Sequence, residues 1–237
     1  MKRLFCLLSV LLLVLPLAGL GAVEPALSPR EDFISRMIET AREEYDAANG
    51  RARKAASSSD IYLCKNFTVY MFRENRDAFR MAEFPEVRLV IPDNLPPEES
   101  KPYVKGVAWK DIPPEVGNPF YAAAVFRYDS KLGKEENRQL AREFLMQVKR
   151  GDFFQMAANY YFGVGPHSLV FTGDYDPESD SVTWTDSNMN GKRVGGVRYG
   201  YIQFDEKRGI DFFVDAFCRK GYGATIYRLR EDIIYAP

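Results

Sequence analysis

The sequence predicts an α+β fold in which helices come first and an antiparallel sheet follows. Before residue 151, apolar residues recur at steps of three and four in three segments, which is typical of amphipathic helices. After residue 151 the pattern changes to short alternating segments, separated by turn sequences such as Asn190-Gly191 and Gly195-Gly196. Helices followed by a run of strands with tight connections favour an α+β arrangement.

We expect helices over the three apolar-striped segments, residues 30–56, 61–80 and 134–150, with Asn49-Gly50 interrupting the first. Ser28 or Pro29 is the expected start of the first helix. The proline-rich stretch 81–119 separates the second helix from the third. There we expect loop, apart from a short strand at Val87–Ile91.

Five later segments predict strands: residues 152–156, 167–173, 181–186, 198–204 and 224–230. The segment from Asp211 to Arg219 is either a short helix or an irregular crossover. The strands therefore follow one another in a meander that the N-terminal helices cover.

The N-terminus has the organisation of a secretory signal peptide, which we place at residues 1–22. Two basic residues precede an apolar run from Leu4 to Leu15, and small residues follow up to Ala22. The run is shorter than the roughly 20 residues that span a bilayer. We therefore expect an exported protein, periplasmic or extracellular, whose mature part, residues 23–237, forms one domain.

The charge and the ligand-forming residues exclude several function classes. A net charge of −1 gives no global attraction for nucleic acid or anionic lipid, so we expect neither as a partner after signal removal. One histidine and the two distant cysteines of the mature part do not make a tetrahedral metal site. Gly163-Val164-Gly165 lacks the spacing and the lysine of a phosphate loop. We expect no metal and no cofactor, and the oligomeric state stays open.

One set of residues indicates nucleophilic chemistry. Cys64 lies in the first turn of the second predicted helix, where the positive end of the dipole favours a thiolate. His167, the only histidine, begins a predicted strand and is the candidate base. The next strand ends near Asp186 and Asn188, and hairpin pairing brings that end beside His167. We expect one of these two side chains to orient the imidazole.

The second mature cysteine leaves an alternative open. An exported protein can keep a disulfide, and Cys64 would then be bridged to Cys218. A bridged sulfur cannot attack a carbonyl. In that case the chain would be a non-catalytic domain that binds a cell-wall component or a partner protein.

The ordered set of short sequences resembles the papain-like CHAP and NlpC/P60 cysteine peptidases. The matching pieces are Cys64-Lys65-Asn66-Phe67, Gly151-Asp152-Phe153-Phe154-Gln155, Gly165-Pro166-His167-Ser168-Leu169-Val170 and Asp186-Ser187-Asn188. The resemblance implies that N-terminal helices pack on an antiparallel sheet. It also implies that Cys64 is the nucleophile, that His167 is the base and that Asp186 or Asn188 orients the imidazole.

The resemblance also implies a reaction and a substrate class. Such peptidases mostly cleave amide bonds in peptidoglycan, as amidases or endopeptidases, and export of this chain suits that substrate. The stretch from Cys64 to Gly151 is longer than is usual in these families. This length implies an insertion around residues 85–130.

Overall fold

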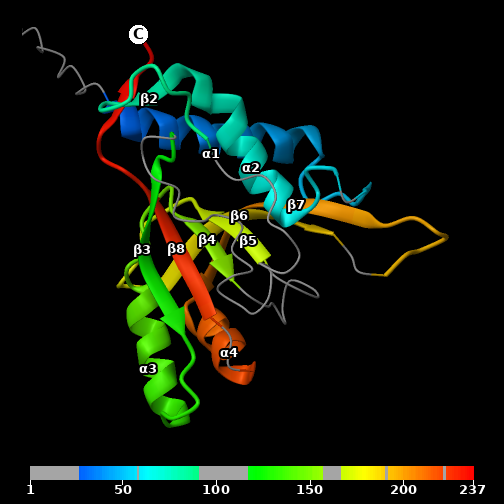
Figure 1. Ribbon diagram of the computed structural model, residues 1–237. Coiled ribbons are helices and arrows are strands. Elements are labelled where there is room, and N and C mark those ends of the chain that lie inside the picture. The colour runs from blue at the N-terminus through cyan, green and yellow to red at the C-terminus, as the bar shows by residue number, and fades with distance from the viewer. Residues whose placement is uncertain (1–26, 58, 91–116, 157–166, 190–191, 221–222) are drawn as a thin grey trace, which may run out of the picture.

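The computed structural model describes residues 27–57, 59–90, 117–156, 167–189, 192–220 and 223–237 (Figure 1). Within these ranges the chain forms four α-helices: α1 (Pro29–Ala47), α2 (Cys64–Asn75), α3 (Lys134–Leu145) and α4 (Asp211–Lys220). A short 3-10 turn, Arg76–Ala78, follows α2. Each of the three predicted helices is present but shorter than its predicted segment, and residues 54–55 and 79–80, which the prediction placed in helices, lie in strands. The segment 211–219 is a helix.

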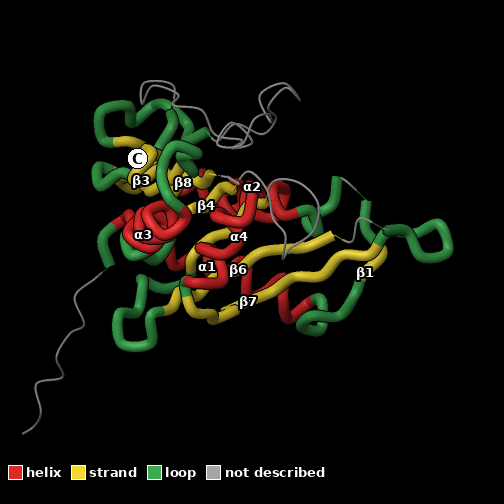
Figure 2. The backbone as a smooth tube through the Cα atoms, turned by 90° about the horizontal axis from the view of Figure 1, so that it is seen from below, coloured by secondary structure: helices red, strands yellow, loops and turns green. Residues whose placement is uncertain are grey.

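Seven strands form one antiparallel sheet in the order β1-β7-β6-β5-β4-β8-β3. Their bounds are β1 Lys54–Ala55, β3 Phe120–Arg127, β4 Phe153–Met156, β5 His167–Phe171, β6 Ser181–Met189, β7 Tyr199–Gly209 and β8 Gly223–Leu229. β1 pairs with the beginning of β7 and forms one edge of the sheet (Figure 2). β2 (Phe79–Met81) and β9 (Ile233–Tyr235) make a separate two-stranded sheet. The expected α+β class with an antiparallel sheet is confirmed.

The sheet lies between two pairs of helices. Neighbouring residues of a strand point to opposite faces, and β4 shows this with two phenylalanines. Phe153 belongs to the apolar cluster that contains α1 and α2, whereas Phe154 belongs to the cluster that contains α3 and α4. α1 and α2 therefore cover one face, and α3 and α4 cover the other (Figure 1).

The first helix covers its apolar stripe and ends at the expected interruption, before residue 56. Ser28 caps its N-terminus with a hydrogen bond to the main-chain N–H of Glu31 at 3.2 Å, as expected at this position. The helix ends at Ala47 because Asn49 and Gly50 adopt left-handed backbone angles, with φ of 60° and 66°. The left-handed conformation is a common way to terminate a helix.

One expectation for the segment between α2 and α3 needs correction, and the segment also contains a strand that was not predicted. Val87–Val90 form no strand, and the main-chain N–H of Val90 instead donates to the carbonyl of Gly117 at 2.8 Å. Phe120–Arg127, placed in the expected insertion, forms β3 and pairs with β8 along its whole length. This part of the segment belongs to the main sheet, and residues 91–116 lie outside the described residues.

The expected signal peptide also lies outside the described residues. Among the residues that the structure describes, none of the helices has the length and apolar character needed to cross a membrane.

A substitution of Gly151 would measure how tightly α1 packs on the sheet. Its φ is +85°, and a Cβ atom there would lie 2.6 Å from Cγ1 of Ile34, which is 1% exposed on α1. We predict that Gly151→Ala lowers the free energy of unfolding by about 2 kcal/mol or more, because left-handed strain and overpacking act together. Urea denaturation measures this change.

Gly173→Ala is the matched control, because an added Cβ there meets nothing within 4 Å. We expect a change of less than about 0.5 kcal/mol for this variant. Equal stability of the two variants would contradict the packing described for α1.

Candidate active site

Cys64 is the first residue of α2. The loop before it is held by side chains: Asn66 Nδ2 donates to the carbonyl of Asp60 at 3.0 Å, and Asp60 Oδ2 accepts from the main-chain N–H of Ser57 at 2.7 Å. Tyr62 lies directly against Gly200 of β7, where a Cβ atom would come within 2.5 Å of the Tyr62 Cβ. The glycine thus allows the loop to approach the sheet, and Cys64, taken as a whole residue, is only partly buried.

His167 is the first residue of β5 and is 2% exposed. Its Nε2 atom lies 2.7 Å from Oδ2 of Asp186 on β6, and Asp186 is fully buried. The other carboxylate oxygen, Oδ1, accepts a hydrogen bond of 2.9 Å from Nε2 of Gln203 on β7. Three neighbouring strands therefore supply one buried chain of hydrogen bonds.

A β-bulge places Gln203 in this chain. Trp184 pairs with Glu206 and Asp186 pairs with Gln203, so two residues of β7 stand opposite Thr185 alone. One of them, Asp205, has a φ of 51°, and the Thr185 hydroxyl donates to the Gln203 carbonyl at 2.7 Å. Regular pairing would have put Phe204 opposite Asp186. Bulges of this kind commonly redirect side chains at functional sites.

Cys64 and His167 form a coupled acid–base pair. Burial by itself raises the pKa of the Cys64 thiol, but the charge of His167, its hydrogen bond and the main-chain N–H of Ser168 together hold that pKa below its ordinary value. Burial likewise disfavours the imidazolium, yet the Cys64 thiolate and the hydrogen bonds to Asp186 and Cys64 raise the pKa of His167 to about 9. The downward shift of the thiol pKa and the upward shift of the imidazole pKa both favour the thiolate–imidazolium form of the pair.

The two candidates for orienting His167 behave differently. Asp186 makes the contact with the imidazole. Asn188 pairs with Tyr201 further along the ladder and is 5% exposed, and its Nδ2 has no hydrogen-bond partner among the described residues. The structure brings together Cys64, His167 and Asp186 and leaves Asn188 outside this set.

The alternative in which Cys64 and Cys218 form a disulfide is wrong. Neither cysteine takes part in a disulfide. Cys64 begins α2 on one face of the sheet, whereas Cys218 lies in α4 and packs against the cluster on the opposite face. Burial raises the pKa of the Cys218 thiol, so this second sulfur is the less reactive one.

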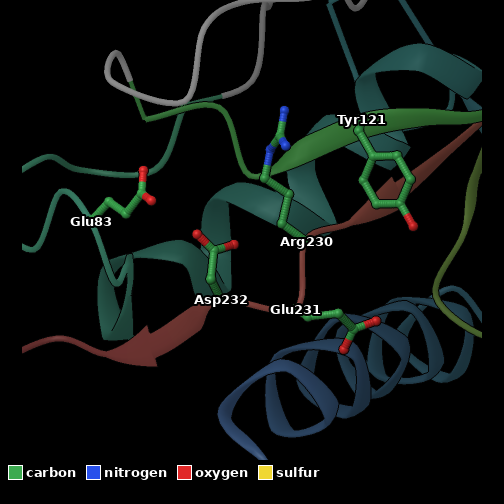
Figure 3. A pocket seen from close by; sticks show the side chains of 5 residues that line it. All are labelled: Glu83, Tyr121, Arg230, Glu231 and Asp232. Carbon is green, nitrogen blue, oxygen red and sulfur yellow. The ribbon is translucent and has the colours of Figure 1, made fainter.

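A separate pocket lies at the end of β8 and has a volume of about 470 Å³ (Figure 3). Its lining is mostly charged and consists of Glu83, Tyr121, Arg230, Glu231 and Asp232. None of the residues around Cys64 contributes to it, so it is distinct from the candidate active site. Among the described residues, no group of three histidine, cysteine or acidic side chains is arranged to hold a metal ion.

Comparison of the chain with known protein families, with curated proteins and with solved structures gave no match. The interpretation of the site therefore depends on its own geometry. Gln203 is the member that sequence reasoning missed, and the signal for it, a bulge opposite Thr185, is not visible in the residue pattern.

The pKa shifts predict how iodoacetamide distinguishes the two cysteines. We expect Cys64 to react at pH 6 and Cys218 to react appreciably only at higher pH, because thiolate is the reacting form. His167→Ala removes the imidazolium, raises the pKa of Cys64 and slows its labelling at pH 6 by about tenfold or more. Mass spectrometry of the adducts measures both rates, and equal rates for the two sulfurs would contradict the coupled pair.

The contact between Asp186 and His167 predicts a second difference. Asp186→Asn removes the negative charge that stabilises the imidazolium. The same charge also raises the pKa of Cys64 directly, but this is the smallest of the effects on the thiol, so we expect slower alkylation of Cys64 at pH 6. Asn188→Ala is the control and should leave the rate within about twofold, since no hydrogen bond described for the structure joins Asn188 to the pair. A larger effect of the Asn188 variant would reverse the assignment.

Proposed function

We propose that this chain is an exported thiol hydrolase that cleaves amide bonds in peptidoglycan, as an amidase or endopeptidase with a papain-like fold of the CHAP or NlpC/P60 type. The observation that carries the proposal is a partly exposed cysteine at a helix start, coupled to a buried His167–Asp186 pair. A nucleophile, a base and a group that orients the base are what acyl transfer through a thiol requires.

In the first half-reaction the Cys64 thiolate attacks the carbonyl carbon of the amide. The carbonyl oxygen takes up the negative charge in a tetrahedral intermediate, and the first-turn amides of α2 offer positive potential there. The His167 imidazolium then gives its proton to the departing nitrogen, and the C–N bond breaks. The products are a free amine and a thioester on Cys64.

In the second half-reaction the neutral His167 removes a proton from water, and the resulting hydroxide attacks the thioester. Collapse of this intermediate breaks the C–S bond, releases the carboxylic acid product and restores the thiolate and imidazolium. Asp186 stabilises the imidazolium in both stages through its 2.7 Å contact, and Gln203 fixes the carboxylate.

The proposed substrate rests on the sequence. The expected signal peptide at residues 1–22 favours a substrate outside the cytoplasm, and the resemblance to cell-wall peptidases favours an amide of peptidoglycan. The residues around His167 and Asp186 support the chemistry but leave the choice among such amides to experiment.

Digestion of purified peptidoglycan by the mature chain, residues 23–237, tests the proposal. We expect new amine and carboxyl termini in the fragments, measured by mass spectrometry, and a loss of more than about 10³-fold in rate for Cys64→Ala. Cys218→Ala is the matched control and should keep the wild-type rate. The rate should also fall above a pH of about 9, where His167 loses the proton that the leaving amine needs.

Two results would overturn this proposal. Full hydrolysis by Cys64→Ala would exclude the thiol mechanism. Tight association of the wild type with intact peptidoglycan, with no fragment released, would instead support a non-catalytic domain that binds a cell-wall component.

A further inference from the structure

Three polar side chains form a buried row across neighbouring strands beside the site. Gln155 on β4 stands opposite Ser168 on β5 and opposite Thr225 on β8. The three residues are 2%, 4% and 1% exposed. They point to the face covered by α1 and α2, because Phe153, two residues before Gln155, belongs to that cluster.

The two ends of the Gln155 carboxamide have different surroundings. The carbonyl, Oε1, accepts a hydrogen bond of 2.9 Å from the Ser168 hydroxyl. The amide, Nε2, has no hydrogen-bond partner among the described residues. A buried donor without a partner costs free energy, which an apolar residue at this place would avoid. Packing alone therefore does not explain a glutamine here.

Ser168 connects Gln155 with the nucleophile. It directly follows His167, and its main-chain N–H donates to the sulfur of Cys64. The Ser168 hydroxyl bonds Gln155 across the β4–β5 pair, so this contact ties the two strands together at Ser168. Holding β5 at this residue also restricts the position of the Ser168 main-chain N–H.

We propose that Gln155 is a positioning residue: its side-chain carbonyl holds the Ser168 hydroxyl and thereby aligns the Ser168 main-chain N–H on the sulfur of Cys64. The inference deepens the proposed function and rests on it, because it takes Cys64 as the nucleophile. It assigns Gln155 no contact with substrate.

The charged groups around Cys64 stay unchanged when Gln155 or Ser168 is substituted. They are His167 on β5, Asp186 on β6 and Lys65 on α2 itself. None of them contacts the side chain of Gln155 through a hydrogen bond or ion pair described for the structure. A shift in the titration of Cys64 on changing Gln155 is thus transmitted through Ser168.

The experiment measures the rate of Cys64 alkylation by iodoacetamide between pH 4 and pH 9 in the whole mature chain. Gln155→Met keeps the length of the side chain and removes the acceptor, and Ser168→Ala removes the donor but keeps the main-chain N–H. Both should move the midpoint of the profile to higher pH and lower the rate below that midpoint by about three- to tenfold. The double variant should shift no further than either single variant, because each breaks the same contact.

Thr225→Val is the matched control. Thr225 is the other neighbour of Gln155 in the row, and its hydroxyl has no partner among the described residues. The profile of this variant should coincide with that of the wild type. A shift as large as that of Gln155→Met would show a general effect of the buried row and would overturn the proposal.

A wild-type alkylation profile for Ser168→Ala would also overturn the positioning role of Gln155. Ser168→Ala removes only one hydroxyl, so it still tests this role if Gln155→Met does not fold. The readout needs no substrate, so the two proposals fail separately. Shifted profiles in a protein that hydrolyses no amide would overturn the proposed function alone. Hydrolysis by the wild type with unshifted profiles would overturn the positioning role alone.

Discussion

The buried contact between His167 and Asp186 is the interaction on which the rest of the site depends. Both side chains are almost wholly removed from water, and a charge buried without its partner is strongly destabilising, by about 3–5 kcal/mol. The contact forms only when β5 and β6 are in their observed register. The contact between His167 and Asp186 therefore depends on correct pairing of these two strands.

The negative charge of Asp186 requires a second constraint. Its remaining oxygen needs a donor, and the donor comes from β7 because the bulge opposite Thr185 shifts Gln203 into line. The same bulge requires a left-handed backbone at Asp205. Some backbone strain in β7 thus accompanies a carboxylate in which each oxygen has a hydrogen-bond partner. The carboxylate is thereby held as a fixed counter-charge for the imidazolium.

Sequence reasoning reached Cys64, His167 and Asp186 because each depends on local pattern: a helix start, a strand start and the end of the next strand in a hairpin. It left Asp186 and Asn188 unresolved because residues two apart share a face of a strand, and β6 runs on to Met189, beyond the predicted end. Gln203 and β3 were not predicted from the sequence, for a different reason. Their places are set by a bulge and by pairing with β8, which are contacts between distant segments.

The two cysteines show what activates a thiol in this fold. Both are partly exposed and both lie in helices, yet their pKa values shift in opposite directions. Cys64 stands at the first position of α2, and an imidazole faces it. Cys218 lies near the C-terminal end of α4, where the dipole disfavours a thiolate, and the opposing charges of Arg138 and Asp215 lie beside it. Burial acts in the same direction on both sulfurs, so the difference comes from the partner that the sheet presents. An imidazole held by a buried carboxylate makes one of two otherwise similar sulfurs a nucleophile.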